Sequence, residues 1–141
     1  MYPSFIPGSV VALLLSAIYI QSTCADEKAP DREVEIKKLL NERRDTLREC
    51  FRLYELQYRE GRTRGMEDLL DLQLMLVEVN LKLAEGMAER LQVLEENVRK
   101  LSQIEKIAHQ QNQRGARSSA DFLRARAARI EAEIKLLQAG G

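Results

Sequence analysis

A helical pattern that is interrupted twice in the same way is the feature that most constrains this chain. Beyond residue 31, apolar side chains recur three or four positions apart, which is the spacing of an α-helix. The pattern stops at Gly61 and again at Gly115, and after each glycine a polar stretch precedes a new apolar stripe. Glycine is costly inside a helix and common in turns. The sequence therefore predicts an all-α fold of two helical hairpins, with hairpin tips near 60–66 and 114–119.

The two interruptions belong to an internal repeat. The tripeptide Asp68-Leu69-Leu70 corresponds to Asp121-Phe122-Leu123 in the second copy. If each copy is a hairpin, the chain has to reverse between the copies, and Gly86 is the candidate breaker. We therefore expect a turn near 85–87, although one glycine does not exclude a single helix over 67–113. Four antiparallel helices joined by short turns form a bundle.

The last helical segment carries the most regular apolar stripe of the chain. Its members are spaced by alternating steps of three and four residues: Ala120, Leu123, Ala127, Ile130, Ile134 and Leu137. Less regular stripes comprise Ile36, Leu40, Leu47, Phe51, Tyr54 and Tyr58 in the first segment, and Met87, Leu91, Leu94, Val98, Leu101 and Ala108 in the third. Such steps are the heptad spacing of coiled coils. The sequence therefore predicts an antiparallel four-helix bundle or coiled coil, and its stripes are candidate surfaces for a protein partner or a homo-oligomer.

The beginning of the chain has a different composition and predicts a signal peptide over residues 1–25. Val10–Ile20 is apolar apart from one serine, and Thr23-Cys24-Ala25 offers small residues at a cleavage site. A polar lead, 26–31, then precedes the helical hairpin-repeat domain, 32–138. We expect an exported protein, located in the periplasm or associated with the outer membrane. The alternatives are an uncleaved anchor or a misassigned start, and an unprocessed leader fits a cytosolic coiled coil.

Charge and motif content argue against several classes of function. The chain holds 22 basic and 22 acidic residues, so its overall balance attracts neither nucleic acid nor an anionic membrane. No phosphate-binding loop follows a strand, and no serine or cysteine has a recognisable base partner. His109 lacks the second carboxylate–histidine pair of metal sites in helical bundles. We therefore predict a non-enzymatic protein with no catalytic residue, cofactor or metal site. The sequence identifies no small-molecule substrate. We expect membrane contact only through an assembly or an uncleaved leader.

Two further groups of residues have an ordinary structural interpretation. A basic cluster in the second hairpin is interpreted as a solvated helix face paired with nearby glutamates; it comprises Arg114, Arg117, Arg124, Arg126 and Arg129. Cys50 would be the only cysteine of the mature chain, and we interpret it as a small, buried apolar side chain. A disulfide between two chains is the alternative for this cysteine.

The two tip segments resemble the periplasmic hairpin tips of the TolC-like outer-membrane efflux protein family. In that family an aromatic residue and a glycine precede a short polar stretch and an Asp–apolar–Leu–Asp motif. The first copy has Tyr58, Gly61 and Asp68-Leu69-Leu70-Asp71, and the second has Gly115, Arg117, Ser118 and Asp121. The resemblance covers about residues 50–137, and the chain has no strand pattern for the family's β-barrel. It is therefore similar to the α-helical hairpin portion alone.

The resemblance implies roles for the tip residues. In the family, three chains build a tunnel, and the tips close its entrance and meet a periplasmic adaptor. Asp68 and Asp71 match paired aspartates that affect cation passage, Asp121 matches one of them, and Tyr58 and Arg117 match residues that hold the entrance closed. Helix-dipole complementarity of the aspartates and an exposed loop arginine are the structural alternatives. We expect helix–helix association within an efflux or transport assembly; the alternative is a stand-alone structural or scaffolding bundle.

Overall fold

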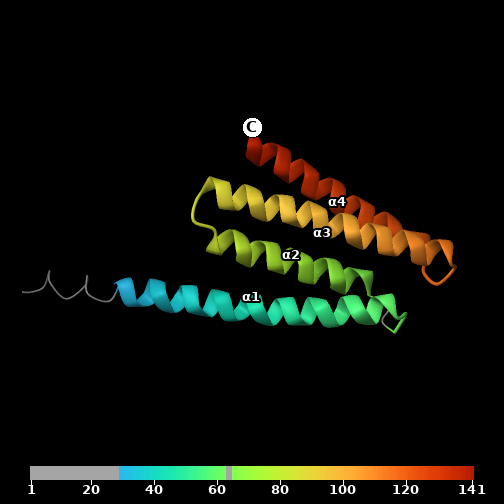
Figure 1. Cartoon of the computed structure of the whole chain (residues 1–141), viewed down its shortest axis with the longest axis horizontal. Coiled ribbons are helices and arrows are strands. Elements are labelled where there is room, and N and C mark those ends of the chain that lie inside the picture. Colours follow the sequence, from blue (N-terminus) through green and yellow to red (C-terminus); the bar gives the residue numbers. More distant parts are fainter. Residues whose placement is uncertain (1–28, 63–64) are drawn as a thin grey trace, which may run out of the picture. The chain divides into compact units, whose positions relative to one another are not determined.

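The computed structural model describes residues 29–62 and 65–141, which form four α-helices (Figure 1). The helices are α1 (Ala29–Arg59), α2 (Met66–Leu83), α3 (Met87–Gln113) and α4 (Ser119–Gly140). All regular structure in this part of the chain is helical, so the predicted all-α fold of hairpins is confirmed. The predicted signal peptide lies outside the described residues. Of the predicted polar lead, 29–31 belong to the first turn of α1, where Pro30 is well tolerated.

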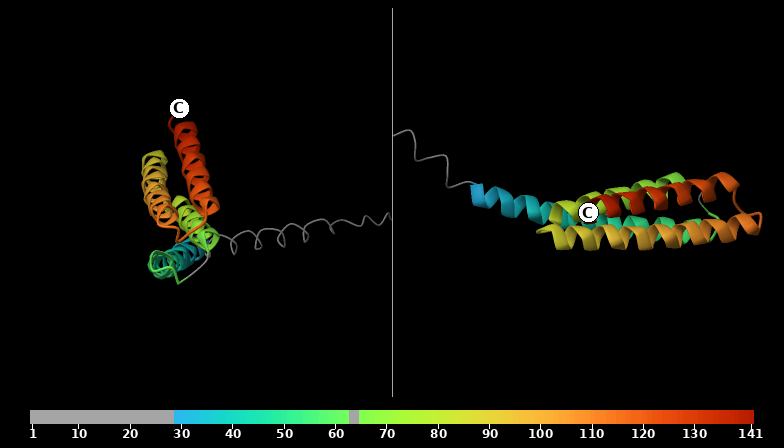
Figure 2. Two further views of the ribbon diagram at one scale, coloured as in Figure 1. Left: turned by 90° about the vertical axis from the view of Figure 1, so that its right-hand side faces the viewer. Right: turned by 90° about the horizontal axis from the view of Figure 1, so that it is seen from above.

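By their contacts, the described residues divide after Glu35, and the helices pack on one another within residues 36–141. Figure 2 shows α3 and α4 side by side and antiparallel, with α2 next to them. Side chains from the second half of α1 complete the core. No helix in the described part of the chain is both long and apolar enough to cross a membrane.

Three glycines and one serine mark the turns and the capped helix start of this fold. Gly61 and Gly115 adopt left-handed backbone conformations, with φ of +73° and +68°, and they end α1 and α3 in tight turns. Ala84 is extended and Gly86 has φ of +117°, so residues 67–113 comprise two helices, not one. Ser118 caps α4 by accepting a hydrogen bond from the backbone N–H of Asp121 at 3.3 Å.

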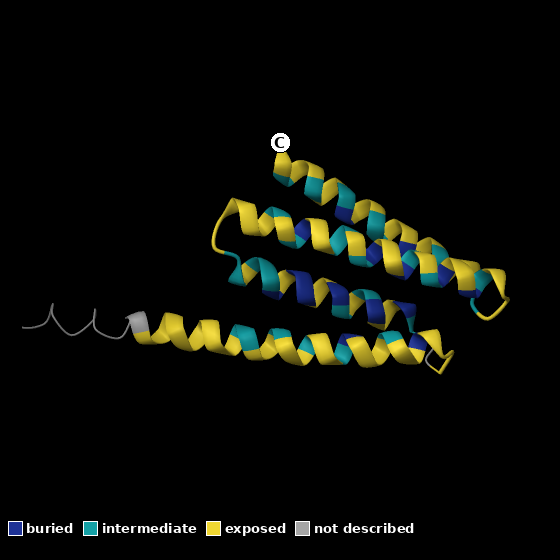
Figure 3. Ribbon diagram, in the orientation of Figure 1, coloured by how far each residue is buried: buried dark blue, intermediate teal, exposed yellow. Residues whose placement is uncertain are grey.

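The core is richest along α2, and the first part of α1 is exposed (Figure 3). The buried residues of the core come from all four helices. They are Phe51, Tyr58, Met66, Leu69, Leu76, Leu101, Ile104, Ala108, Ala125 and Ala132. The stripes of α1 and α3 contribute in part: Phe51 and Leu101 are buried, whereas Ile36 and Met87 are exposed. The nearly all-round apolar character of α2 follows from its contacts with several neighbours.

The most extensive contact between two helices in the described part of the chain is between α3 and α4. Ala108 on α3 and Ala125 on α4 are fully buried, and Ala132 is nearly so. Small side chains let two helix backbones approach closely, and close approach leaves no room for a larger residue. Arg129 bridges the two helices by pairing with Glu105 on α3. The face of α4 that packs on α3 is therefore lined mainly by alanine, not by the leucines and isoleucines of its stripe.

Candidate functional site

The two hairpin tips are joined by one buried glutamine. Gln111 lies near the end of α3, and its Nε2 donates to the carbonyl oxygens of Tyr58 at 2.9 Å and of Arg59 at 3.2 Å. These carbonyls belong to the last turn of α1, where a helix leaves acceptors without intrahelical partners. The Gln111 Oε1 accepts from Nε of Arg117 at 3.3 Å. The end of the first hairpin arm is thus held by the second hairpin.

Around this glutamine, the structure brings three of the predicted tip residues together. The guanidinium of Arg117 lies 4.6 Å from the centre of the Tyr58 ring, which is cation–π geometry. Tyr58 is 1 % exposed, and no group among the described residues hydrogen-bonds its hydroxyl. Burial, and after it the Asp121 carboxylate, raises the pKa of this hydroxyl to about 12, and Arg117 opposes this rise. Tyr58, Arg117 and Asp121 therefore form one tip cluster within a single chain.

The other predicted tip residues have different surroundings. Gly61 and Gly115 supply the turns, while Asp68 and Asp71 lie exposed on the first turns of α2. A Cβ at Gly65 would lie 2.2 Å from the Asp68 carboxylate, so glycine here leaves room for that side chain to fold back over the helix start. An acid at this place complements the helix dipole. Asp121, by contrast, is buried.

Metal-ligating residues do not gather in the described part of the chain, where no group of three or more His, Cys, Asp or Glu could hold an ion. The ring of His109 lies 4.9 Å from that of Phe122, and its Nε2 is 2.9 Å from the side-chain amide of Gln113. Cys50 is a half-buried free thiol. Two members of the basic cluster in the second hairpin have separate partners: Arg124 pairs with Glu67 at 3.0 Å, and Arg129 pairs with Glu105 and Glu133.

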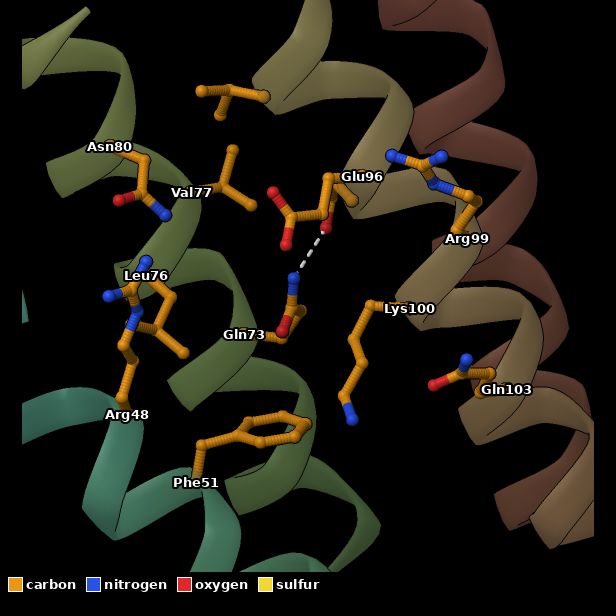
Figure 4. A pocket seen from close by; sticks show the side chains of 12 residues that line it. Arg48, Phe51, Gln73, Leu76, Val77, Asn80, Glu96, Arg99, Lys100 and Gln103 are labelled. Atoms are coloured by element: carbon orange, nitrogen blue, oxygen red, sulfur yellow. Dashed lines mark hydrogen bonds between the residues drawn. The ribbon is translucent and has the colours of Figure 1, made fainter.

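A groove of about 420 Å³ lies between α1, α2 and α3 (Figure 4). Phe51 and Leu76 line it, and Gln73 donates to Asn97 across it at 2.9 Å. The Lys100 ammonium is 4.8 Å from the centre of the Phe51 ring and 3.1 Å from the Glu55 carboxylate, which ties α3 to α1. The described residues that line this groove include no serine, cysteine or histidine, so it offers no nucleophile with a base partner.

The α4 stripe faces outward. Four of its large side chains are substantially exposed: Leu123 at 58 %, Ile130 at 41 %, Ile134 at 45 % and Leu137 at 76 %. A heptad stripe normally lies against another helix, because that contact removes its apolar surface from water. The most regular stripe of the chain is therefore without a covering helix among the described residues. Comparisons with protein-family models, with characterised proteins and with solved structures give no match.

Proposed function

We propose that this protein is an exported α-helical assembly component that acts without catalysis, through helix–helix association at the α4 stripe. The single observation that carries the proposal is the outward position of four large apolar side chains at heptad spacing on one helix. An exposed apolar patch of this kind is typical of interaction sites. The resemblance of the tips to TolC-like efflux proteins suggests an efflux or transport assembly as the setting.

A second candidate, a stand-alone structural or scaffolding bundle, is favoured by the tip cluster. Tyr58 and Arg117 match residues that close a tunnel entrance in the family that the tips resemble. In this chain they contact each other, and Gln111 links both to the end of α1. Tips that hold one another within one chain need no tunnel partner. This candidate keeps the tip cluster as a structural clasp and assigns no transport role.

Photo-crosslinking in the cells that make the protein tests the association. A photoreactive residue replaces Ile134 in the full chain and, as a matched control, Leu74, which is exposed at 60 % on α2. We expect a discrete crosslinked product at position 134 and none at position 74. Equal labelling at the two positions, or no product at position 134, contradicts the proposal. Export is tested separately by determining the N-terminal residue of the protein isolated from these cells. If the leader is cleaved, the protein begins at Asp26; an N-terminus at Met1 argues against cleavage.

A further inference from the structure

We infer that the partner of the α4 stripe is the α4 stripe of a second copy of this chain, packed antiparallel to the first. This inference rests on the proposed function and names the occupant of the same surface. It is an isologous contact, in which both copies use the same face. The arguments are the position of the stripe on α4, the sizes of its side chains and the charges that flank it.

The stripe is accessible to a second helix without any change in the bundle. At 3.6 residues per turn, the stripe positions lie roughly opposite Ala125 and Ala132 on the helical wheel. Those alanines are buried against α3, while Leu123 and Leu137 are exposed. Because α4 is already folded against α3, docking does not have to pay for forming the helix.

Side-chain sizes along the stripe favour an antiparallel pair. Three layers describe one half of the pair, and twofold symmetry repeats them: Ala120 against Leu137, Leu123 against Ile134, and Ala127 against Ile130. Small residues then face large ones, which is how facing layers of a well-packed core interdigitate. A parallel pair would instead place each residue against its own copy, so Ala120 and Ala127 would leave underfilled layers between leucine and isoleucine layers.

The flanking charges agree with the same orientation. In the antiparallel alignment, Arg126 of one copy faces Glu133 of the other, and Arg124 faces Glu131. Symmetry repeats both pairs, and neither places like charges together. Among the described residues Arg126 has no ion partner within its own chain. The other three groups have exposed or half-exposed partners that docking has to share or replace: Glu133 pairs with Arg129 at 2.6 Å, Glu131 with Lys135 at 3.4 Å and Arg124 with Glu67 at 3.0 Å. A self-complementary pattern of this kind selects a second copy, because the surface supplies both halves of each pair.

Cysteine crosslinking between differently tagged full-length chains tests the inference. Both native cysteines are first replaced, as Cys24→Ser and Cys50→Ser. Chains with Leu123→Cys are then co-expressed with chains that carry Ile134→Cys, and mild oxidation is followed on a non-reducing gel. We expect a disulfide that joins the two tags, at several times the yield of either chain with itself. Because both positions are exposed, the substitutions are compatible with folding.

The matched control is Leu74→Cys, which replaces a leucine of similar exposure outside the stripe. If the mixed product does not exceed the Leu74→Cys background, the inference is overturned. Self-disulfides of Leu123→Cys and of Ile134→Cys overturn the antiparallel arrangement, because they require parallel helices. If these chains do not crosslink while the photoreactive residue at 134 captures a different protein, the proposed function survives and the inference fails. If neither method gives a product, both fail.

Charge reversal supplies an independent readout. Arg126→Glu sets like charges against Glu133 of the second copy, and we expect the dissociation constant of the dimer to rise about tenfold at low salt. The effect should shrink as salt is added. Lys106→Glu makes the same change at an exposed position on α3 and should leave the constant unchanged. Equal effects of the two reversals would contradict the pairing.

Discussion

Enlarging one alanine on each face of α4 distinguishes the packed face from the exposed one. Ala125 is 0 % exposed on the face of α4 that packs on α3, and Ala108 of α3 is also 0 % exposed. Ala125→Leu adds three carbons to a fully buried site. Overpacking of a well-packed core typically costs about 1–3 kcal/mol. The close approach of the two helices places this site in the upper half of that range, so we expect a loss of about 2–3 kcal/mol in the free energy of unfolding.

The matched variant is Ala127→Leu, which makes the same chemical change two residues further along the same helix. In the single chain Ala127 is exposed on the stripe, and substitutions at such positions change the stability of the monomer by about 0.5 kcal/mol or less. Urea unfolding followed by circular dichroism measures both variants, at two protein concentrations so that any association shows as a concentration dependence. Equal losses, or a larger loss for Ala127→Leu, would refute the assignment of the two faces.

Three further predictions concern the hairpin tips. Gln111→Leu removes the side chain that joins the tips and should cost about 1–2 kcal/mol of unfolding free energy, whereas Gln110→Leu, at the exposed neighbouring position, should cost less than about 0.5 kcal/mol in the same urea assay. The added methyl group of Gly115→Ala meets no atom within 4 Å, but the substitution forces φ of +68° on an L-residue, so we expect a loss of about 1 kcal/mol in the free energy of unfolding. Asparagine tolerates this conformation better, so Gly115→Asn should lose less. Equal losses for the two variants would argue against the backbone explanation. The pKa of Tyr58 is raised to about 12, above its ordinary value of about 10. The neutral hydroxyl therefore contributes its full stabilisation below pH 10, and this contribution is lost as pH rises toward 12. Tyr58→Phe should lose less stability than the wild type between pH 10 and 12, and parallel pH profiles of the two proteins would contradict this.

The helical class and the hairpins could be predicted from the sequence because they follow from local patterns. Two widely spaced glycines, each followed by acidic or hydroxyl residues and a new stripe, specify a turn and a helix start with little help from the rest of the chain. The turn at Gly86 is also marked by a glycine, but its signal is weaker. Ala84, which is extended in this turn, has no local sequence pattern that predicts its conformation.

Which face of α4 packs inward could not be predicted from periodicity. α4 has two apolar faces, one of alanine and one of leucine and isoleucine, and both repeat at helical spacing. Hydrophobicity favours burial of the larger residues. The structure buries Ala125 and Ala132 instead, because small residues allow α3 to approach closely, and it leaves Leu123 exposed. That choice depends on the distance between two helices, which is a tertiary property.

Some residues of the tip cluster could be predicted from the sequence, and others could not. The resemblance to the efflux family points to Tyr58 and Arg117, and these two residues lie in contact. Gln111, which holds the cluster to α1, carries no distinguishing local signal among neighbouring glutamines. The polar contact in the groove has a weak signal in the sequence. Gln73 is a polar residue inside a strongly apolar helix, and a buried glutamine needs a hydrogen-bond partner, but the sequence does not identify that partner as Asn97.

The molar mass of the full chain in reducing solution tests the central claim most directly. Light scattering at several concentrations should give twice the mass of one chain, falling to the monomer on dilution. Ile134→Glu should shift the protein to the monomer at every concentration, and Leu74→Glu should behave like the wild type. A wild-type chain that stays monomeric throughout, or an oligomer that Ile134→Glu leaves intact, would contradict self-association through the α4 stripe.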